Sequence, residues 1–522
     1  MAKHSREWWW RGGALGSKVP GVGLTAEALV RWLGLIYFCV FVSWWREAAG
    51  LIGPRGILPA GDYLQAVAAH FHGLARFWFA PSLLWFSSST LALGLGCGAG
   101  IAAAVAVMAC WHPRAALAVD LVAFLSLIAC AQVFASYQSD GMLMTAGFCA
   151  LFLLEGRGPQ RGVRSATRLG APSWWSWFSL RWLWFTIYFG SGVAKWMSHD
   201  PQWRHLAALN QYYQNLPLPN WLGWYAQQYL PQGAEAAITA SILVVEIFVV
   251  WLAFLPRRWR IACFWMVTPF QIAIILTANY GFLNYLVLGL GLTLIDDRHI
   301  RWLLRMPQVA VERAEPAART AIASLALVAL VAITGWNLAG RLWTGLPAPQ
   351  SVNLALEPFR VADPFGLFAV MTRNRYEIEF QGSRDGTVWT AYPFRYQPQD
   401  PVRAPVGDWF LFAPYQPRFE WNLWFASLGS YSQYRWVELT ELRLLENDPA
   451  VTGLFASNPF AHQPPKAVRA VLWQYWFATP AEKREQGVWW RRQKLGLYAP
   501  VLVMTAQGAE VLREPGRGGG NF

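Results

Sequence analysis

Long apolar runs recur along the first two thirds of this chain, and they constrain its fold more than any other feature. The first extends from Leu24 to Trp45, a stretch of 22 residues that ends at Arg46. A helix rises about 1.5 Å per residue, so such a run crosses a hydrocarbon core of about 30 Å. We predict an α-helical polytopic membrane bundle of about nine spans, at residues 24–45, 88–109, 115–135, 142–154, 175–193, 234–255, 261–277, 282–295 and 320–342. The fourth run is short, and a re-entrant segment is its alternative.

Composition supports a membrane protein and argues against other classes. Hydrophobic residues make up 55% of the chain and charged residues only 14%. The net charge of +13 does not indicate nucleic acid as a partner, because most Arg residues lie in short loops between apolar runs, where basic residues set membrane topology. All six Cys lie inside apolar runs, and His70 and His72 are spaced too closely to share a helical face. We therefore expect no disulfide, no metal site and no cofactor.

Basic residues also predict the orientation of the spans. With the N-terminus inside, the inner segments hold 17 Lys and Arg and the outer segments hold 5. Nine crossings then place everything after Leu342 outside the cytosol. We expect four parts: a basic inner tail at 1–23, a transmembrane domain at 24–343, an extramembrane domain at 344–510 and a disordered tail at 511–522.

Several compositional signals indicate a bacterial inner membrane as the location. Arg outnumbers Lys 37 to 6, a bias common in GC-rich bacterial genomes, and the chain has no Asn-x-Ser/Thr sequon. The basic start is not followed directly by a short apolar region with a cleavage site, so we expect the first span itself to direct insertion.

The C-terminal part has a different pattern, which predicts a soluble, strand-rich α+β domain. Alternating residues on both sides of Asp385 and Gly386 predict a β-hairpin, since Asp-Gly is a strong hairpin turn signal. Two segments have helical periodicity, FEWNLWFASLG and YRWVELTELRLLEND, and two further segments are predicted strands, AVRAVLWQYWFAT and VWWRRQKLGLYAP.

Small residues in the second span predict a close helix contact. Gly94, Gly96, Gly98 and Gly100 form two overlapping Gly-x-x-x-Gly pairs, which let a neighbouring helix approach.

Among the ionisable residues inside the predicted spans, we consider Arg181, Asp120 and Glu246 as candidates for a buried charge pair. Counting residues from the inner ends places them at compatible depths. An unpaired charge in a bilayer costs about 2.5–3.5 kcal/mol or more, so we expect Arg181 to pair with Glu246, Asp120 or both. Such a pair either pins the bundle or serves a substrate or proton.

Lys195 lies where the fifth apolar run ends, and it allows two interpretations. It is an anchor that reaches the outer interface, or it is a catalytic amine desolvated among Tyr188, Trp196 and Trp203. The sequence contains no Gly-x-Ser-x-Gly elbow, phosphate loop or metal-spaced His pair that would support a hydrolase or a nucleotide-binding protein.

Several segments together resemble the lipase maturation factor family. They are GVAKW with PQWRHLAALNQYYQNLPLPNWLGWY, ILTANYGFLNYL, DPFGLFAVMTRNRYEIEFQGSRDGTVWTAYPFRYQP, PYQPRFEWNLWFASLG and NPFAHQPPKAVRAVLWQYWF with VWWRRQ, in family order over roughly residues 175 to 500.

The resemblance implies a polytopic membrane chaperone rather than an enzyme. In animals the family is expected in the endoplasmic reticulum membrane, where it assists secreted lipases to fold and assemble. Membrane lipid and exported client proteins would be the partners. Under this resemblance Arg418, Trp421 and Trp424, with the turn at Asp385 and Gly386, would shape a client-facing exposed domain; the alternative is that they form its core.

A second, shorter resemblance supplies the alternative function. YFGSGVAKW is similar to the membrane segment of the vitamin K-dependent carboxylase group. This likeness implies a membrane enzyme in which Lys195 acts as a base on a lipid, quinol or protein substrate.

Overall fold

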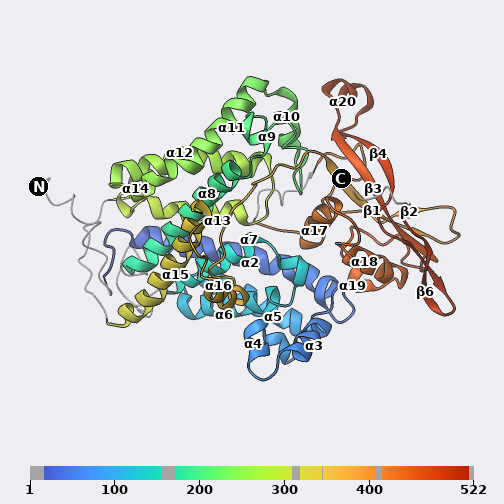
Figure 1. The fold of residues 1–522 in the computed structure, drawn as a ribbon, viewed down its shortest axis with the longest axis horizontal. Helices are drawn as coiled ribbons and strands as arrows, with labels where there is room; N and C mark the ends of the chain where they lie inside the picture. Colours follow the sequence, from blue (N-terminus) through green and yellow to red (C-terminus); the bar gives the residue numbers. More distant parts are fainter. Residues whose placement is uncertain (1–16, 154–171, 308–317, 344, 406–413, 516–522) are drawn as a thin grey trace, which may run out of the picture.

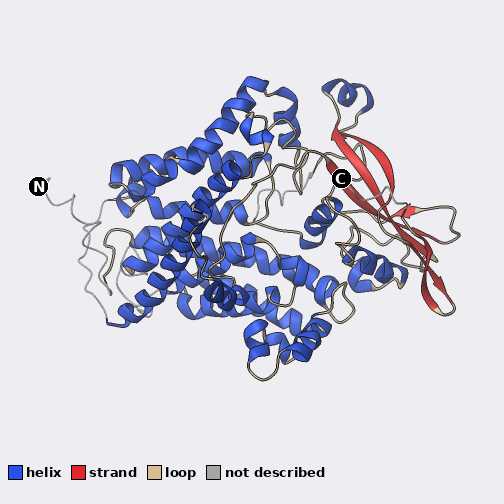
Figure 2. Cartoon of the chain, in the orientation of Figure 1, coloured by secondary structure: helices blue, strands red, loops and turns tan. Residues whose placement is uncertain are grey.

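A computed structural model describes residues 17–153, 172–307, 318–343, 345–405 and 414–515. The strands gather at one end of the molecule, and helices fill the rest (Figures 1 and 2). Helix α2 (Gly23–Ile52) runs through the bundle toward the sheet. Its side chains are largely buried, so the first apolar run forms a central element of the bundle.

The helical part contains, after α2, the following elements: α3 (Ala60–His70), α4 (Ala75–Phe79), η1 (Leu83–Trp85), α5 (Thr90–Met108), α6 (Pro113–Ile128), η2 (Gln132–Ala135), α7 (Gln138–Leu151), α8 (Trp174–Met197), α9 (Pro201–Arg204), α10 (Trp221–Tyr229), α11 (Gln232–Ile247), η3 (Val249–Phe254), α12 (Arg257–Thr277), α13 (Leu283–Leu290), η4 (Gly291–Leu294), α14 (Asp297–Leu303), α15 (Ala318–Leu342), α16 (Gln350–Leu356) and η5 (Glu357–Phe359). The C-terminal part contains β1 (Arg375–Ser383), β2 (Thr390–Ala391), α17 (Arg418–Ser427), α18 (Trp436–Leu445), α19 (Pro449–Thr452), β3 (Ala467–Phe477), α20 (Pro480–Gln486), β4 (Trp490–Leu497), β5 (Val501–Thr505) and β6 (Gly508–Arg513).

Five helices of the described chain are long and apolar enough to cross a membrane, which confirms the predicted class of protein. They are α2, α5, α11 with η3, α12 and α15. The other predicted spans also form helices, but α6 has 16 residues and α7 has 14. These lengths correspond to about 24 Å and 21 Å, less than a hydrocarbon core of about 30 Å. A total of nine spans therefore stays a prediction.

The glycines of α5 do not all contact a neighbouring helix. A Cβ built on Gly100 would lie 2.5 Å from the ring of Phe41, and one on Gly98 would lie 3.0 Å from the ring of Trp45. Both contacts are with α2. A Cβ on Gly94 or Gly96 meets no atom within 4 Å. The close approach of α2 and α5 therefore depends on one glycine from each predicted pair.

The C-terminal sheet has the strand order β2-β1-β3-β5-β6, and β4 pairs with β3 beside β5. Strands β1 and β3 pair antiparallel along their length, from Arg375 opposite Tyr475 to Ser383 opposite Ala467. Helices α17 and α18 pack on one face of this pair. The predicted strand and helix types are confirmed here.

Two details of the C-terminal domain differ from the prediction, namely the loop of its hairpin and the end of its last strand. The hairpin does not close with a two-residue turn, because Gly382 pairs with Thr390 and leaves a longer loop around Asp385. Strand β6 extends to Arg513 and pairs with β5, so the predicted disordered tail at 511–522 begins too early. The last part of that tail, 516–522, lies outside the described residues.

Candidate functional site at the junction of bundle and C-terminal domain

A strap, residues 361–374, connects the bundle to β1 and lies along the loop between α8 and α10. The backbone N–H of Met371 donates to the carboxylate of Asp200 at 2.7 Å. The indole of Trp203 donates to the carbonyl of Phe368 at 3.0 Å. Side chains of the α8–α10 loop thus satisfy the backbone of a strap that has no regular secondary structure of its own.

The small residues of YFGSGVAKW explain how the strap packs on α8. A Cβ on Gly190 would lie 2.5 Å from the carbonyl oxygen of Phe365, so only glycine permits this approach. The hydroxyl of Ser191 accepts a hydrogen bond from the backbone N–H of Leu367 at 3.1 Å. The motif therefore forms a binding surface for the strap.

Lys195 forms a buried ion pair with Glu246 of α11. The two amine-to-carboxylate distances are 2.9 and 2.7 Å, and the Lys195 side chain is only 3% exposed. Gly192 allows the two helices to approach, because a Cβ there would lie 2.9 Å from Glu246. The amine also lies 5.3 Å from the ring centroid of Trp203 and 5.7 Å from that of Phe368. Lys195 is thus enclosed by the strap and the α8–α10 loop.

The predicted pairing of Arg181 with Glu246 or Asp120 is wrong. Glu246 binds Lys195, near the C-terminal end of α8, because α11 meets α8 there rather than at its middle. Within the described chain, neither carboxylate oxygen of the buried Asp120 has a hydrogen-bond partner. Arg181 instead donates to the carbonyl of Thr293.

Two arginines bind the end of η4. Arg181 Nε donates to the carbonyl of Thr293 at 3.1 Å, and Arg260 Nε donates to the carbonyl of Leu294 at 2.7 Å. The last carbonyls of a helix lack partners within the helix and carry partial negative charge. A guanidinium donates hydrogen bonds to these carbonyls, and its positive charge balances their partial negative charge. These buried arginines therefore have a structural role.

Arg418 ties α17 of the C-terminal domain to the bundle. Its guanidinium donates to the two carboxylate oxygens of Asp140 at 3.0 and 2.6 Å, and also to the carbonyl of Phe134 at 2.9 Å. It lies 4.4 Å from the ring centroid of Trp44 in α2. Both charged side chains are almost completely buried, with 1% and 0% exposed. A bidentate pair of this kind fixes orientation as well as position.

A second set of bonds joins the same helix to α2. The backbone N–H of Phe419 donates to the carboxylate of Glu47 at 3.1 Å. The hydroxyl of Ser43 donates to the carbonyl of Gln416. Polar groups of α2 and α7 therefore hold the start of α17. Those of α2 lie in a long apolar helix of the bundle.

Arg418, Trp421 and Trp424 do not form an exposed client surface. Trp421 is 6% exposed and Trp424 is 7% exposed, and both lie in the buried side of α17. This agrees with the alternative that these residues belong to the core.

Asp385 and Gly386 do lie at the surface. The Asp385 carboxylate accepts the N–H groups of Thr387 and Val388, each at 2.8 Å, and these bonds lower its pKa to about 2. Gly386 has φ +77°, which glycine adopts without strain. These contacts explain the turn, and they give no indication of a ligand.

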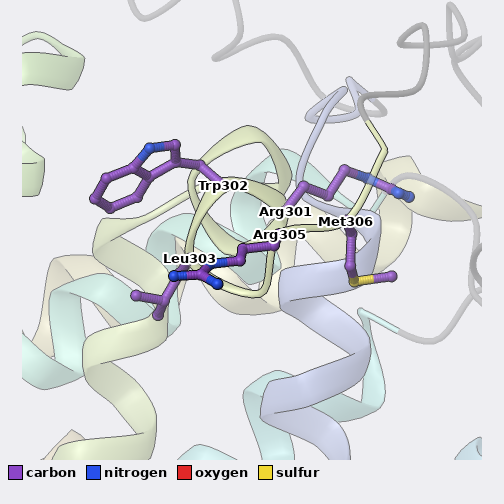
Figure 3. A pocket seen from close by; sticks show the side chains of 5 residues that line it. All are labelled: Arg301, Trp302, Leu303, Arg305 and Met306. Atoms are coloured by element: carbon purple, nitrogen blue, oxygen red, sulfur yellow. The ribbon is translucent and has the colours of Figure 1, made fainter.

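A surface hollow at α14, lined by residues that do not belong to this junction, measures about 640 Å³. Figure 3 shows that the side chains of Arg301 and Arg305 extend in different directions there, beside Trp302. Arg301 donates to the carbonyl of Pro307 at 3.0 Å. The hollow contains no acid or nucleophile, and no group of metal ligands occurs among the described residues. We therefore place the candidate site at the junction.

The sequence did not predict several residues of the junction. Asp140 stands at the start of an apolar run, where a carboxylate is a signal for a buried cationic partner. Arg375 and Glu377 form a buried pair on one face of β1, and Arg375 also donates to the carbonyl of Gln214 at 3.0 Å. Their spacing of two residues in a strand was the available signal.

Comparisons with known proteins identify the family. A family model described as the lipase maturation factor transmembrane domain matches residues 24–302, and one described as the lipase maturation factor C-terminal domain matches residues 361–500. The chain belongs to the lipase maturation factor family.

Relatives align over nearly the whole chain. Lipase maturation factor 1 of Bos taurus is 31% identical over 514 residues, which cover 92% of this chain and 89% of that protein. Lipase maturation factor 2 of Homo sapiens is 29% identical over 620 residues, covering 93% and 84%. No solved structure matches the chain significantly.

Proposed function

We propose that this membrane protein assists the folding or assembly of exported lipases. The matching relatives are named for lipase maturation, and they align along both parts of the chain. The observation that carries the proposal is the buried Arg418–Asp140 pair, which joins the C-terminal domain to the helical bundle. A domain held in this way beside the membrane is suited to receive client proteins as they emerge from the membrane.

The contacts of the C-terminal domain support an outer location for it. The domain and its strap bind Asp140, Asp200 and Trp224. All three lie in segments that the distribution of Lys and Arg assigns to the outside. The composition favours a bacterial inner membrane, and the family favours the endoplasmic reticulum in animals; in both, the domain would lie outside the cytosol.

The membrane-enzyme alternative lacks support from the surroundings of Lys195. Its amine donates to both oxygens of Glu246 and is buried, so it is engaged in an ion pair rather than open to a substrate. The cavity beside α8, which Thr186 and Phe365 line, holds only about 20 Å³. That volume is too small for a quinol or a lipid tail.

Deletion of the gene in its native host, followed by quantitative proteomics of the exported fraction, tests the proposal. We expect exported lipases to decrease in amount or activity. Wild-type protein and an Arg435→Ala control, which alters an exposed residue of the C-terminal part, should restore them. Arg418→Ala should not. An unchanged exported proteome, together with loss of a small-molecule product, would contradict the proposal and favour an enzyme.

A further inference from the structure

In the part of the chain that the structure describes, strand β4 has one edge without a neighbouring strand. Among the described residues β4 pairs only with β3, from Trp490 opposite Phe477 to Leu497 opposite Val471. Residues 491–495 are all exposed, so neither face of this strand is covered there. The strand lies in the sheet at the end of the molecule away from the helical bundle (Figures 1 and 2).

The hydrogen-bond pattern identifies the backbone groups that point away from β3. The N–H of Ala478 donates to the carbonyl of Trp489, so that carbonyl faces β3 and fixes the phase of the ladder. Bonded and non-bonded pairs alternate along an antiparallel ladder. Trp490, Arg492 and Lys494 are therefore in non-bonded pairs, and their N–H and C=O groups face outward.

The first of these outward groups already has a partner from another segment. The N–H of Trp490 donates to the carbonyl of Pro401 at 3.2 Å, and that of Trp489 donates to the same oxygen at 2.7 Å. The corresponding groups of Arg492 and Lys494 have no such bond within the described chain. The edge is thus geometrically able to accept a further strand, and that strand would continue where the Pro401 segment ends.

The charge of β4 limits what can occupy this edge. Its exposed segment carries Arg491, Arg492 and Lys494. Two carboxylates lie at the limit of ion pairing: Glu482 is 3.6 Å from Arg491, and Glu379 is 3.5 Å from Arg492. A second copy of the chain would bring like charges together, and basic residues on an edge prevent such self-pairing. An acidic strand would form favourable cross-strand pairs instead.

We propose that β4 binds an extended acidic segment of a client protein as an added strand. The proposal rests on the proposed function, since it assigns a contact site and a chemistry to the client. Backbone hydrogen bonds of Arg492 and Lys494 would supply sequence-independent binding, and the cations would select acidic segments. Such a mode suits a factor that binds chains before their own sheets are complete.

Binding of a synthetic peptide to the full-length protein in detergent tests this proposal. The probe is a fluorescent eight-residue peptide of alternating Glu and Val, and its counterpart carries N-methyl groups on alternate amides. We expect the N-methylated peptide to bind at least about tenfold more weakly, because it cannot complete the backbone ladder. Equal binding of the two peptides would overturn strand addition.

Charge reversal supplies the second arm. Arg491→Glu with Lys494→Glu should weaken binding of the unmodified peptide roughly tenfold. Arg384→Glu with Arg513→Glu is the matched control, since it changes net charge equally at exposed positions off β4 and should leave affinity unchanged. Arg492 is left intact because it donates to the carbonyl of Gln399 at 2.8 Å. Equal loss in both double variants would contradict a site at β4.

Two further outcomes separate this inference from its alternatives. If the β4 variant loses only binding to vesicles that contain phosphatidylglycerol, the edge is a lipid contact and the proposal is wrong. If the β4 variant restores exported lipases as fully as wild type does in the deletion strain, the proposed function stands and the β4 site fails. Equal thermal midpoints of the variants and the wild type establish that folding is unchanged.

Discussion

The guanidinium of Arg418 in α17 and the carboxylate of Asp140 in α7 form a bidentate ion pair across 278 positions of sequence. Both groups are buried where the C-terminal domain meets the bundle. Removing one partner of a buried pair leaves a charge without compensation, which costs about 3–5 kcal/mol. This relationship explains how a sheet-containing domain is fixed to a set of membrane helices.

Arg418→Lys should destabilise the junction although it keeps the charge. A lysine amine cannot donate to both carboxylate oxygens and to Phe134 in the same planar geometry, so we expect a loss of about 1.5–3 kcal/mol. Arg435→Lys, at a side chain that is 69% exposed, is the control and should change stability by less than about 0.5 kcal/mol. Thermal unfolding in detergent and limited proteolysis of the strap measure the difference.

Lys195 and Glu246 should behave as one structural unit. Lys195→Met leaves a buried carboxylate unpaired and should lower the free energy of unfolding by about 3–5 kcal/mol. The amount of folded protein should therefore fall strongly. Lys195→Met combined with Glu246→Leu should recover most of that loss. Folded protein is measured by fluorescence-detected size-exclusion chromatography. If the role of the pair is structural, the refolded double variant should also restore function in the deletion strain. If Lys195 is catalytic, the double variant should fold but fail to restore function.

Glycines of α5 provide a test with an internal control. Gly100→Ala places a methyl group against the ring of Phe41 at 2.5 Å and should destabilise the contact of α2 with α5. Gly96→Ala meets open space, so helix propensity alone should stabilise it by roughly 0.5–1 kcal/mol. The two thermal midpoints should therefore shift in opposite directions. Equal shifts would show that the α2–α5 contact is wrong.

The C-terminal domain should lose stability as the pH rises toward neutrality. Burial raises the pKa of Glu420 and that of Glu377 from 4.5 to about 7. Between those values the folded state holds protons that the unfolded state has released, so the free energy of unfolding falls as pH increases. Each residue contributes up to roughly 3 kcal/mol, and the effect ends above pH of about 7. Thermal midpoints at several pH values measure the slope, which Glu420→Gln should make shallower.

Periodicity and run length predicted the elements better than their partners. Leu24 to Trp45 lies inside α2, and AVRAVLWQYWFAT contains β3, because the apolar pattern of a segment determines its own secondary structure. The pairing of Arg181 could not be predicted in this way. Depth along a helix gives position in one dimension, whereas the side-to-side arrangement of α8, α11 and η4 decides which groups meet.

Tertiary context also decides which side chains are exposed. Trp421 and Trp424 belong to a conspicuous aromatic segment, and nothing in their spacing indicates that the bundle covers them. The Gly190 and Ser191 pattern was visible as small residues beside Lys195, but its partner is a strap more than 170 positions later. A long-range contact between a helix and an irregular segment leaves no periodic signal in the sequence.

The orientation of the C-terminal domain is the claim on which the proposed function depends most directly. Fusions of alkaline phosphatase and of green fluorescent protein behind Phe522, each expressed in a bacterial host, measure it. We expect an active phosphatase and a dark fluorescent protein, since the domain would lie outside the cytosol. A bright fluorescent protein with an inactive phosphatase would place the domain in the cytosol and contradict a role in the maturation of exported proteins.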